Sequence, residues 1–185
     1  MTNDQRRFVH DLIAELLNIP KPSVIWANQN NMPRPMKAYA TLRLYNAQRE
    51  AAEELRPTDT PGIMNIVVPT TAMLEVQYTD NQKQNPLETL EQMVRGLEKP
   101  TVADRCQAAR VAFFNAGPVQ DVSFTLGAVA WEHRAAVDLS LRYMSEMTDD
   151  VGYIETVEIG GTLTGPVLTG EVRIDLHVKG ENSNG

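Results

Sequence analysis

The sequence predicts an α+β fold, in which an antiparallel or mixed β-sheet is covered on one side by an N-terminal helix and a central pair of helices. Three patterns predict it: apolar residues at helical spacing near the N-terminus, two helix-start signals in mid-chain, and alternating apolar and polar residues before and after them. The chain has 185 residues, the size of one domain. We therefore expect a single domain over residues 1–179 and a flexible tail over residues 180–185.

The N-terminal helix is expected over residues 2–18. Thr2 followed by Gln5 fits a capping box, and an apolar stripe follows at i, i+3, i+4 spacing. Pro20 ends the helix, because a proline disfavours helical geometry in the residue before it. The stripe is apolar enough to pack against a sheet.

The first long strand is expected over residues 39–45, after a polar loop interrupted by prolines. In it, Ala40, Leu42 and Leu44 alternate with polar residues, which is typical of a half-buried strand.

Residues 46–62 leave two interpretations open. Residues 51–55 have helical propensity, but the segment can equally form the tip of a long β excursion. Strand patterns return over residues 63–68 and 73–79, and Pro69 between them is expected to mark a bend or bulge.

The central helix pair is expected over residues 85–99 and 101–114. Asn85 is a good N-cap, and Pro86 at the first helical position strengthens the signal. Pro100 separates the two helices.

The last third of the chain is predicted to return to β structure. Residues 134–144 have the clearest alternation, and weaker strand patterns follow over residues 153–159 and 172–179. The glycine-rich segment 160–165 is expected to be a hairpin, because no helix follows it to bind a phosphate.

Composition excludes several classes of protein. A formal charge of −7 argues against a duplex-binding clamp and against a surface for anionic lipid. A lone Cys106 excludes an internal disulfide and a cysteine-based zinc cluster, and no stretch approaches a membrane span. We expect a protein made in the cytoplasm, with no membrane partner, metal or cofactor.

Catalytic motifs are nearly absent from the sequence. Cys106 lies in an amphipathic helix and is expected to be a buried structural thiol. The cluster of Glu132, His133 and Arg134 is the only polar group that suggests a small hydrolase, and we keep that as a minor alternative. No catalytic residue is assigned.

Two groups of segments carry a family resemblance. The first is VIWANQN at residues 24–30, followed by PRP at residues 33–35 and YATL at residues 39–42. The second is the strand WEHRAAVDL at residues 131–139, followed by GYIETVEIGGTL at residues 152–163. Occurring in this order, they resemble the neck and tail terminator proteins of tailed bacteriophages.

The resemblance implies a structural protein of the virion. Members of such a family form a ring, usually of six subunits, at the head-proximal end of the tail, where they stop growth of the tail tube and join it to the neck. The implied partners are further copies of the chain, the tail-tube protein, the sheath in contractile phages, and the head–tail connector or adaptor. The genome DNA would pass through the lumen without specific binding, and an acidic inner wall would help it slide.

Candidate interface residues come from two places. The loop is expected to reach a neighbouring subunit through Asn28, Gln29, Asn30, Arg34 and Met36. Glu132 and Arg134 are expected to form an ion pair that supports the fold. An exposed pair contributes only about 0–1 kcal/mol, so replacing Arg134 should impair ring formation more than folding. A head-completion adaptor or a tail-tube protein of the same neck is the structural alternative.

Overall fold

The computed structural model describes residues 1–27, 35, 37–80, 85–126, 130–152, 154–157 and 178–180. Contacts divide the chain into two compact units. Unit 1 comprises Met1–Ala52 and Val68–Ser145, and unit 2 comprises Glu53–Val67 and Glu146–Gly185. Two long strands contribute residues to both units.

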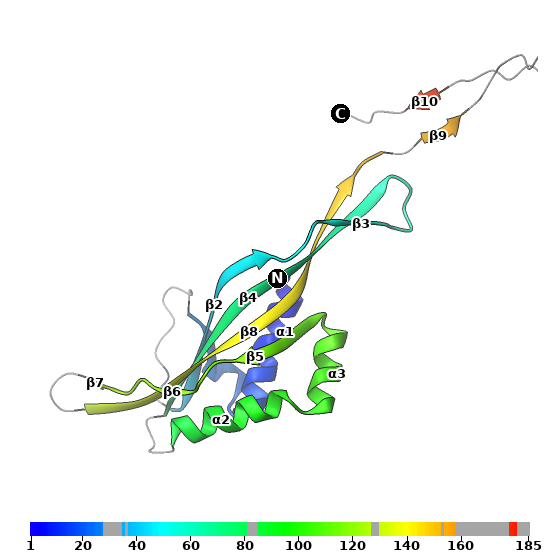
Figure 1. The fold of residues 1–185 in the computed structure, drawn as a ribbon. Helices are drawn as coiled ribbons and strands as arrows, with labels where there is room; N and C mark the ends of the chain where they lie inside the picture. The colour runs from blue at the N-terminus through cyan, green and yellow to red at the C-terminus, as the bar shows by residue number, and fades with distance from the viewer. Residues whose placement is uncertain are drawn as a thin grey trace, which may run out of the picture. The chain divides into compact units, whose positions relative to one another are not determined.

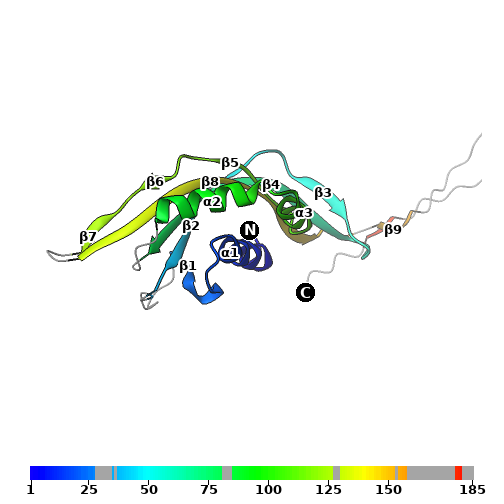
Figure 2. The same ribbon diagram turned by 90° about the horizontal axis from the view of Figure 1, so that it is seen from below.

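Three α-helices of unit 1 lie on one face of its sheet: α1 (Asn3–Leu16), α2 (Pro86–Leu97) and α3 (Pro100–Ala108) (Figure 2). Helix α1 begins at the predicted capping box, in which Thr2 Oγ1 accepts from the Gln5 amide at 3.2 Å and the Gln5 side chain accepts from the Thr2 amide at 2.9 Å. The N-terminal helix and its start were therefore predicted correctly.

Eight of the described strands form one mixed sheet in the order β1-β2-β4-β8-β5, with β3 beside β4 and with β6 and β7 beside β8 (Figure 1). Strand β1 runs parallel to β2, whereas β2 with β4, and β8 with β5, β6 and β7, pair antiparallel. The predicted α+β class and mixed sheet are confirmed. The strand bounds are β1 (Val24–Trp26), β2 (Tyr39–Arg49), β3 (Glu54–Pro57), β4 (Ile63–Asp80), β5 (Val111–Ala116), β6 (Gln120–Asp121), β7 (Phe124–Leu126) and β8 (Ala130–Asp150).

The second central helix is shorter than predicted. We expected it to reach residue 114, but α3 ends at Ala108 and β5 begins at Val111. Arg110 has a φ of 54°, a left-handed conformation that breaks the helix. Val111 then pairs with Tyr143 of β8, so sheet pairing overrides the local helical pattern.

Residues 46–62 form a β excursion, which was one of the two open interpretations. Strand β2 continues through a bulge at Asn46, whose φ is 51°, and β3 follows. On the partner strand, Pro69 lies inside β4 between the residues that pair with β3 and those that pair with β2. Its missing N–H is tolerated there, and its carbonyl accepts from the Glu50 amide at 3.0 Å.

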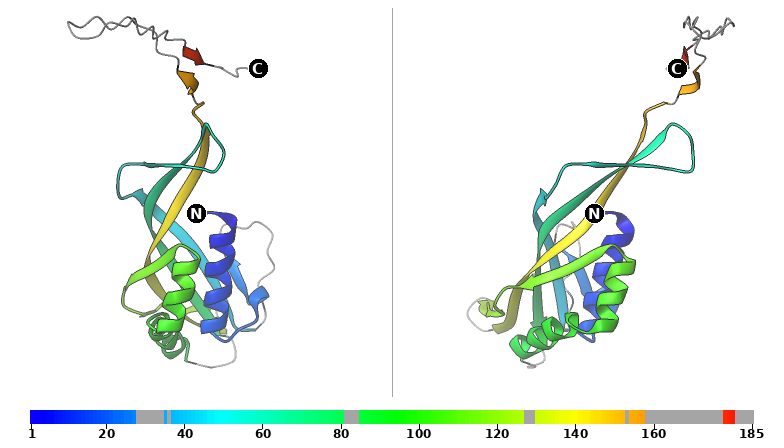
Figure 3. Two further views of the ribbon diagram at one scale, coloured as in Figure 1. Left: turned by 90° about the vertical axis from the view of Figure 1, so that its right-hand side faces the viewer. Right: turned by 45° about the vertical axis from the view of Figure 1, so that its right-hand side comes forward.

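The core of unit 1 lies between the helices and the sheet (Figure 3). The predicted alternation along β8 is confirmed, since Val137, Leu139 and Leu141 are all buried. Cys106 is 6% exposed and packs with Leu12 and Val102 in a smaller cluster under α3, as expected for a structural thiol.

Unit 2 contains β3, the first residues of β4, the last residues of β8, and the antiparallel pair β9 (Ile154–Val157) and β10 (Val178–Gly180). The β3–β4 turn is closed by Thr58, whose hydroxyl donates to the Ile63 carbonyl at 3.0 Å. The predicted hairpin at residues 160–165 and most of the predicted last strand and tail lie outside the described residues.

Candidate functional site

Two of the seven predicted interface residues can be placed. Glu132 and Arg134 lie on β8, on the sheet face opposite the helices, which we call the open face. Strand alternation puts them there, because their neighbours Ala135 and Val137 point into the core. The five loop candidates Asn28, Gln29, Asn30, Arg34 and Met36 lie outside the described residues.

Glu132 and Arg134 form an ion pair, as predicted, but the pair is not an exposed one. The Glu132 side chain is fully buried, and its Oε1 lies 3.0 Å from Arg134 Nη2. Tyr39 on β2 donates its hydroxyl to the same oxygen at 3.4 Å. The sequence alone could not reveal this burial. It depends on the strand order β2-β4-β8, which brings Tyr39 of β2 within reach of Glu132 across β4.

Arg134 also holds the β7 segment against β8. Its guanidinium lies 4.8 Å from the centre of the Phe124 ring, a cation–π contact, and its backbone N–H donates to the Ser123 hydroxyl at 3.0 Å. Its Nη1 donates to Gln77 on β4 at 3.4 Å. Arg134 therefore links β4 on one side of β8 to the β7 segment on the other.

Polar contacts continue across the open face from this pair. Gln77 donates to Glu75 at 2.7 Å, and Glu75 lies 3.8 Å from Arg43 on β2. A depression of about 220 Å³ adjoins Arg134, Gln77 and Glu75. Partial burial and a hydrogen bond to the Asp138 carboxylate raise the pKa of Tyr45 on the same face. Polar side chains of β2, β4 and β8 are therefore connected to one another across this face.

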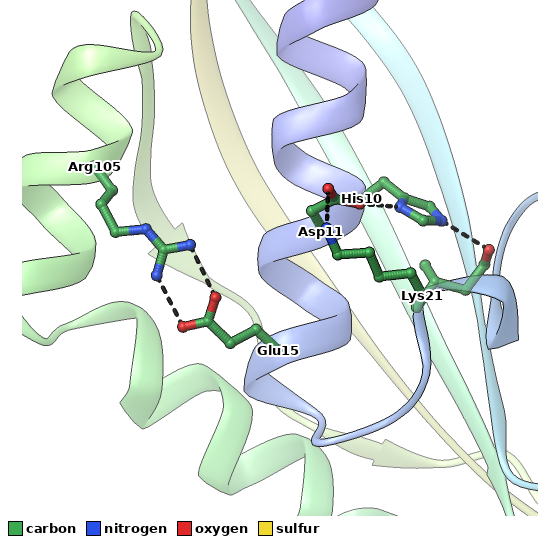
Figure 4. A network of polar contacts seen from close by, with 6 residues as sticks. His10, Asp11, Glu15, Lys21 and Arg105 are labelled. Atoms are coloured by element: carbon green, nitrogen blue, oxygen red, sulfur yellow. Dashed lines mark hydrogen bonds and ion pairs between the residues drawn. The ribbon is translucent and has the colours of Figure 1, made fainter.

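A second polar network ties α1 to its neighbours (Figure 4). Arg105 of α3 donates two hydrogen bonds, of 2.8 and 2.9 Å, to the carboxylate of Glu15, and this lowers the pKa of the Glu15 carboxyl. On the other side of α1, Lys21 lies 2.6 Å from Asp11 and lowers the pKa of that carboxyl. His10 bridges Asp11 and the Val24 carbonyl at 2.8 and 3.0 Å.

The hydrolase alternative is not favoured by this geometry. Residue alternation along β8 puts His133 on the opposite side of the strand from Glu132 and Arg134. Its ring meets that of Trp131 edge-on, with centroids 6.4 Å apart. Glu132 is engaged by Tyr39 and Arg134, so the three residues do not converge on one reacting position.

Metal-ligand clusters and membrane-spanning helices are absent from the part of the chain that the structure describes. Within it, no three His, Cys, Asp or Glu side chains gather in an arrangement that could hold a metal ion. None of its helices has both the length and the apolar character needed to cross a bilayer.

Comparison with known proteins identifies the family. The sequence profile of the phage neck terminator protein matches residues 4–166, which is most of the chain. The chain belongs to the phage neck terminator family. It is a structural protein with a tail-terminating role, and its location is the virion. The resemblance predicted from residues 24–42 and 131–163 is confirmed.

Solved structures add a distant likeness. The chain resembles the sheath/tube terminator, in the extended state, of the extracellular contractile injection system PVC, with 13% identity and a TM-score of 0.37. The match covers 91% of this chain and 66% of that one, so the neck terminator spans just under two thirds of that protein's length. No curated protein matches the chain by sequence.

Sequence reasoning missed the exposed apolar side chains. Phe114, Phe124 and Trp131 in unit 1, and Leu55, Met147 and Val151 in unit 2, are exposed although large and apolar. The sequence holds no signal for this exposure: alternation along β8 puts Trp131 and Met147 at the same positions as the buried Val137 and Leu139, and they are exposed only because of the neighbours that the sheet gives them. Where such side chains form a contiguous patch, they mark an interaction site.

Proposed function

We propose that this neck terminator assembles as a ring of six copies at the head-proximal end of the tail. There it stops growth of the tail tube and joins the tail to the neck. The observation that carries the proposal is the family match over residues 4–166, which includes most of unit 1 and the β8 end of unit 2.

Surface chemistry supports self-association. A closed ring with cyclic symmetry needs two different patches on each subunit, one for each neighbour. Exposed apolar side chains occur in both units, with Trp131 at 58% exposed in unit 1 and Met147 at 64% in unit 2. Each unit thus offers surface for a neighbouring chain.

The proposed partners are the components on either side of the ring in the neck of the particle. The ring would contact the tail-tube protein on one side, the sheath where the tail is contractile, and the head–tail connector or adaptor on the other side. The genome DNA would pass through its lumen without specific binding, since a net charge of −7 per copy repels phosphates. Because His133 and Glu132 lie on opposite faces of β8, the structure gives no support to the alternative of a small hydrolase built on these two residues.

Purified protein and purified virions test the proposal. Light scattering and electron microscopy should reveal rings, either of the protein alone or at the neck of the particle, with one ring per particle. Absence of the protein from virions would contradict the role. Long cylinders in place of single rings would favour the tail-tube alternative, and a ring on heads that lack tails would favour the head-completion adaptor.

A further inference from the structure

The three-stranded part of unit 2 has one apolar face. Leu55 of β3 pairs with Ile66 of β4. On the other side of β4, Thr148 donates to the Asn65 side chain at 3.2 Å, which sets Met147 of β8 beside Ile66. Leu55, Ile66 and Met147 therefore form a row across three strands, because residues at paired positions share a face. We call this surface the ribbon face.

The side chains on either side of the partly buried Ile66 in this row are open to solvent. Leu55 is 57% exposed and Met147 is 64% exposed. Val151 is 56% exposed and lies on the same face, since its amide donates to the Gly62 carbonyl at 2.9 Å and it is four residues beyond Met147. A contiguous apolar face of this kind is typical of an interaction site.

Charge restricts what can cover it. Unit 2 contains eleven acidic and three basic residues, whereas unit 1 contains thirteen acidic and fourteen basic ones. In the strands around the ribbon face, residues 53–67 and 146–152 contain six acidic residues and one basic residue. Two ribbon faces would repel each other, so the partner surface is apolar with a basic rim.

Unit 1 has a surface of that chemistry. A groove of about 640 Å³ lies between α1, the short helix η1 (Lys21–Ser23) and β1. Its apolar lining includes Pro22 and Trp26, and its basic side chains are Arg6, Arg7 and Lys21. We call it the α1 groove.

Charges in the α1 groove are arranged to leave a basic rim. Arg6 lies over the Trp26 ring at 4.6 Å, which fixes its guanidinium at the edge of the apolar surface. Lys21 is matched by Asp11 at 2.6 Å. Arg7, one turn from the helix start, is exposed at the rim of the groove.

We propose that the ribbon face of one copy docks into the α1 groove of a neighbouring copy. The proposal rests on the ring of the proposed function, for which it supplies one interface. Because the two surfaces differ, the contact is heterologous and repeats around a closed ring. Met147 and Val151 meet the apolar lining, while Asp149, between them on the same face, lies near the arginines of the rim.

A cross-linking experiment tests the contact directly. Copies carrying Met147→Cys and differently tagged copies carrying Arg7→Cys are mixed under mild oxidation. Cys106 is 6% exposed, so the introduced thiols are the reactive ones. The mixed disulfide should form at least tenfold more than with the control Arg95→Cys, an exposed arginine on α2. Equal yields from Arg7→Cys and Arg95→Cys would overturn the proposal.

Charge reversal tests the orientation of the contact. Arg7→Glu and Asp149→Arg should each reduce self-association about tenfold, and the double variant should restore it, because the pair is re-formed with opposite signs. Arg95→Glu is the matched control and should leave self-association unchanged, while circular dichroism verifies that each variant is folded. If wild-type rings form and neither single reversal weakens them, the proposed interface is wrong, whereas the proposed function as a ring still stands. If virions contain no ring, the proposed function itself fails, whatever the cross-links show.

Discussion

Arg134 Nη2 lies 3.0 Å from Oε1 of Glu132, a side chain that is wholly buried on the open face of the sheet. The sequence predicted an exposed pair of small energetic effect, whereas the fold removes the carboxylate from water. Removing one partner of a buried pair leaves an uncompensated charge. We therefore expect loss of the pair to reduce the stability of the folded chain, and also to weaken any contact that the neighbouring β7 segment makes.

We expect Arg134→Ala to destabilise the monomer. Breaking a buried pair costs about 3–5 kcal/mol, and we expect the lower end because 24% of the Arg134 side chain is exposed. Urea unfolding measures the loss. Arg134→Met combined with Glu132→Gln should recover much of it, because no buried charge is left unpaired. A single variant as stable as wild type would show that Glu132 is not buried in solution.

The Glu15–Arg105 pair should give a small stability term that depends on pH. Arg105 lowers the pKa of the folded-state Glu15 carboxyl, so the stabilisation is present above the unfolded pKa near 4.5 and is lost as pH falls through the folded value. The pair is exposed, so we expect a coupling of about 0.3–1 kcal/mol at pH 7.

A double-mutant cycle with Glu15→Gln and Arg105→Gln measures that coupling. Thermal unfolding at pH 7 and at pH 3 should show a larger coupling in the first condition than in the second. A coupling of equal size at both values would mean that packing between α1 and α3, and not charge, connects the two residues.

Gly96 of α2 should resist branched side chains. A Cβ at this position would come 2.8 Å from Leu16 Cδ2, because α1 and α2 pack closely here. Leu16 can adjust to one methyl group, so Gly96→Ala should be nearly neutral, whereas Gly96→Val should cost about 1–3 kcal/mol by overpacking. Adding Leu16→Ala should make the valine variant less damaging than the sum of the two changes. Strict additivity would contradict this contact.

Cys106 should be unreactive in the folded protein. Burial raises the pKa of its thiol, and only the thiolate attacks a disulfide reagent. Labelling with Ellman's reagent should be slow in buffer and fast in denaturing urea, with one thiol per chain. Cys106→Ser should lower the free energy of unfolding by about 1–3 kcal/mol, since it buries a hydroxyl among Leu12 and Val102. Rapid labelling of the native chain would show that α3 opens readily.

Local signals predicted the elements that begin with side-chain caps. Thr2 with Gln5, and Asn85 before Pro86, start α1 and α2 where the sequence places them. The end of α3 was predicted wrongly, because residues 111–114 suit either a helix or a strand. Pairing of Val111 with Tyr143, 32 residues further along the chain, decides between them.

The candidate site was predicted only in part. Two side chains on one strand, Glu132 and Arg134, share a face by alternation, so their pairing could be expected from spacing alone. Contacts with Tyr39, Gln77 and Phe124 could not be predicted, because they depend on the strand order and on the register of β7.

The sequence alone determined the class of the fold and its family, because helix caps, strand alternation and the two ordered motifs are local patterns along the chain. Only the tertiary structure decided which charges are buried and which apolar side chains remain outside. Glu132 is polar in sequence yet buried, and Met147 is apolar yet exposed. The physical reason is that the burial of a side chain depends on which residues pack around it in the folded sheet. Those residues come from distant parts of the chain.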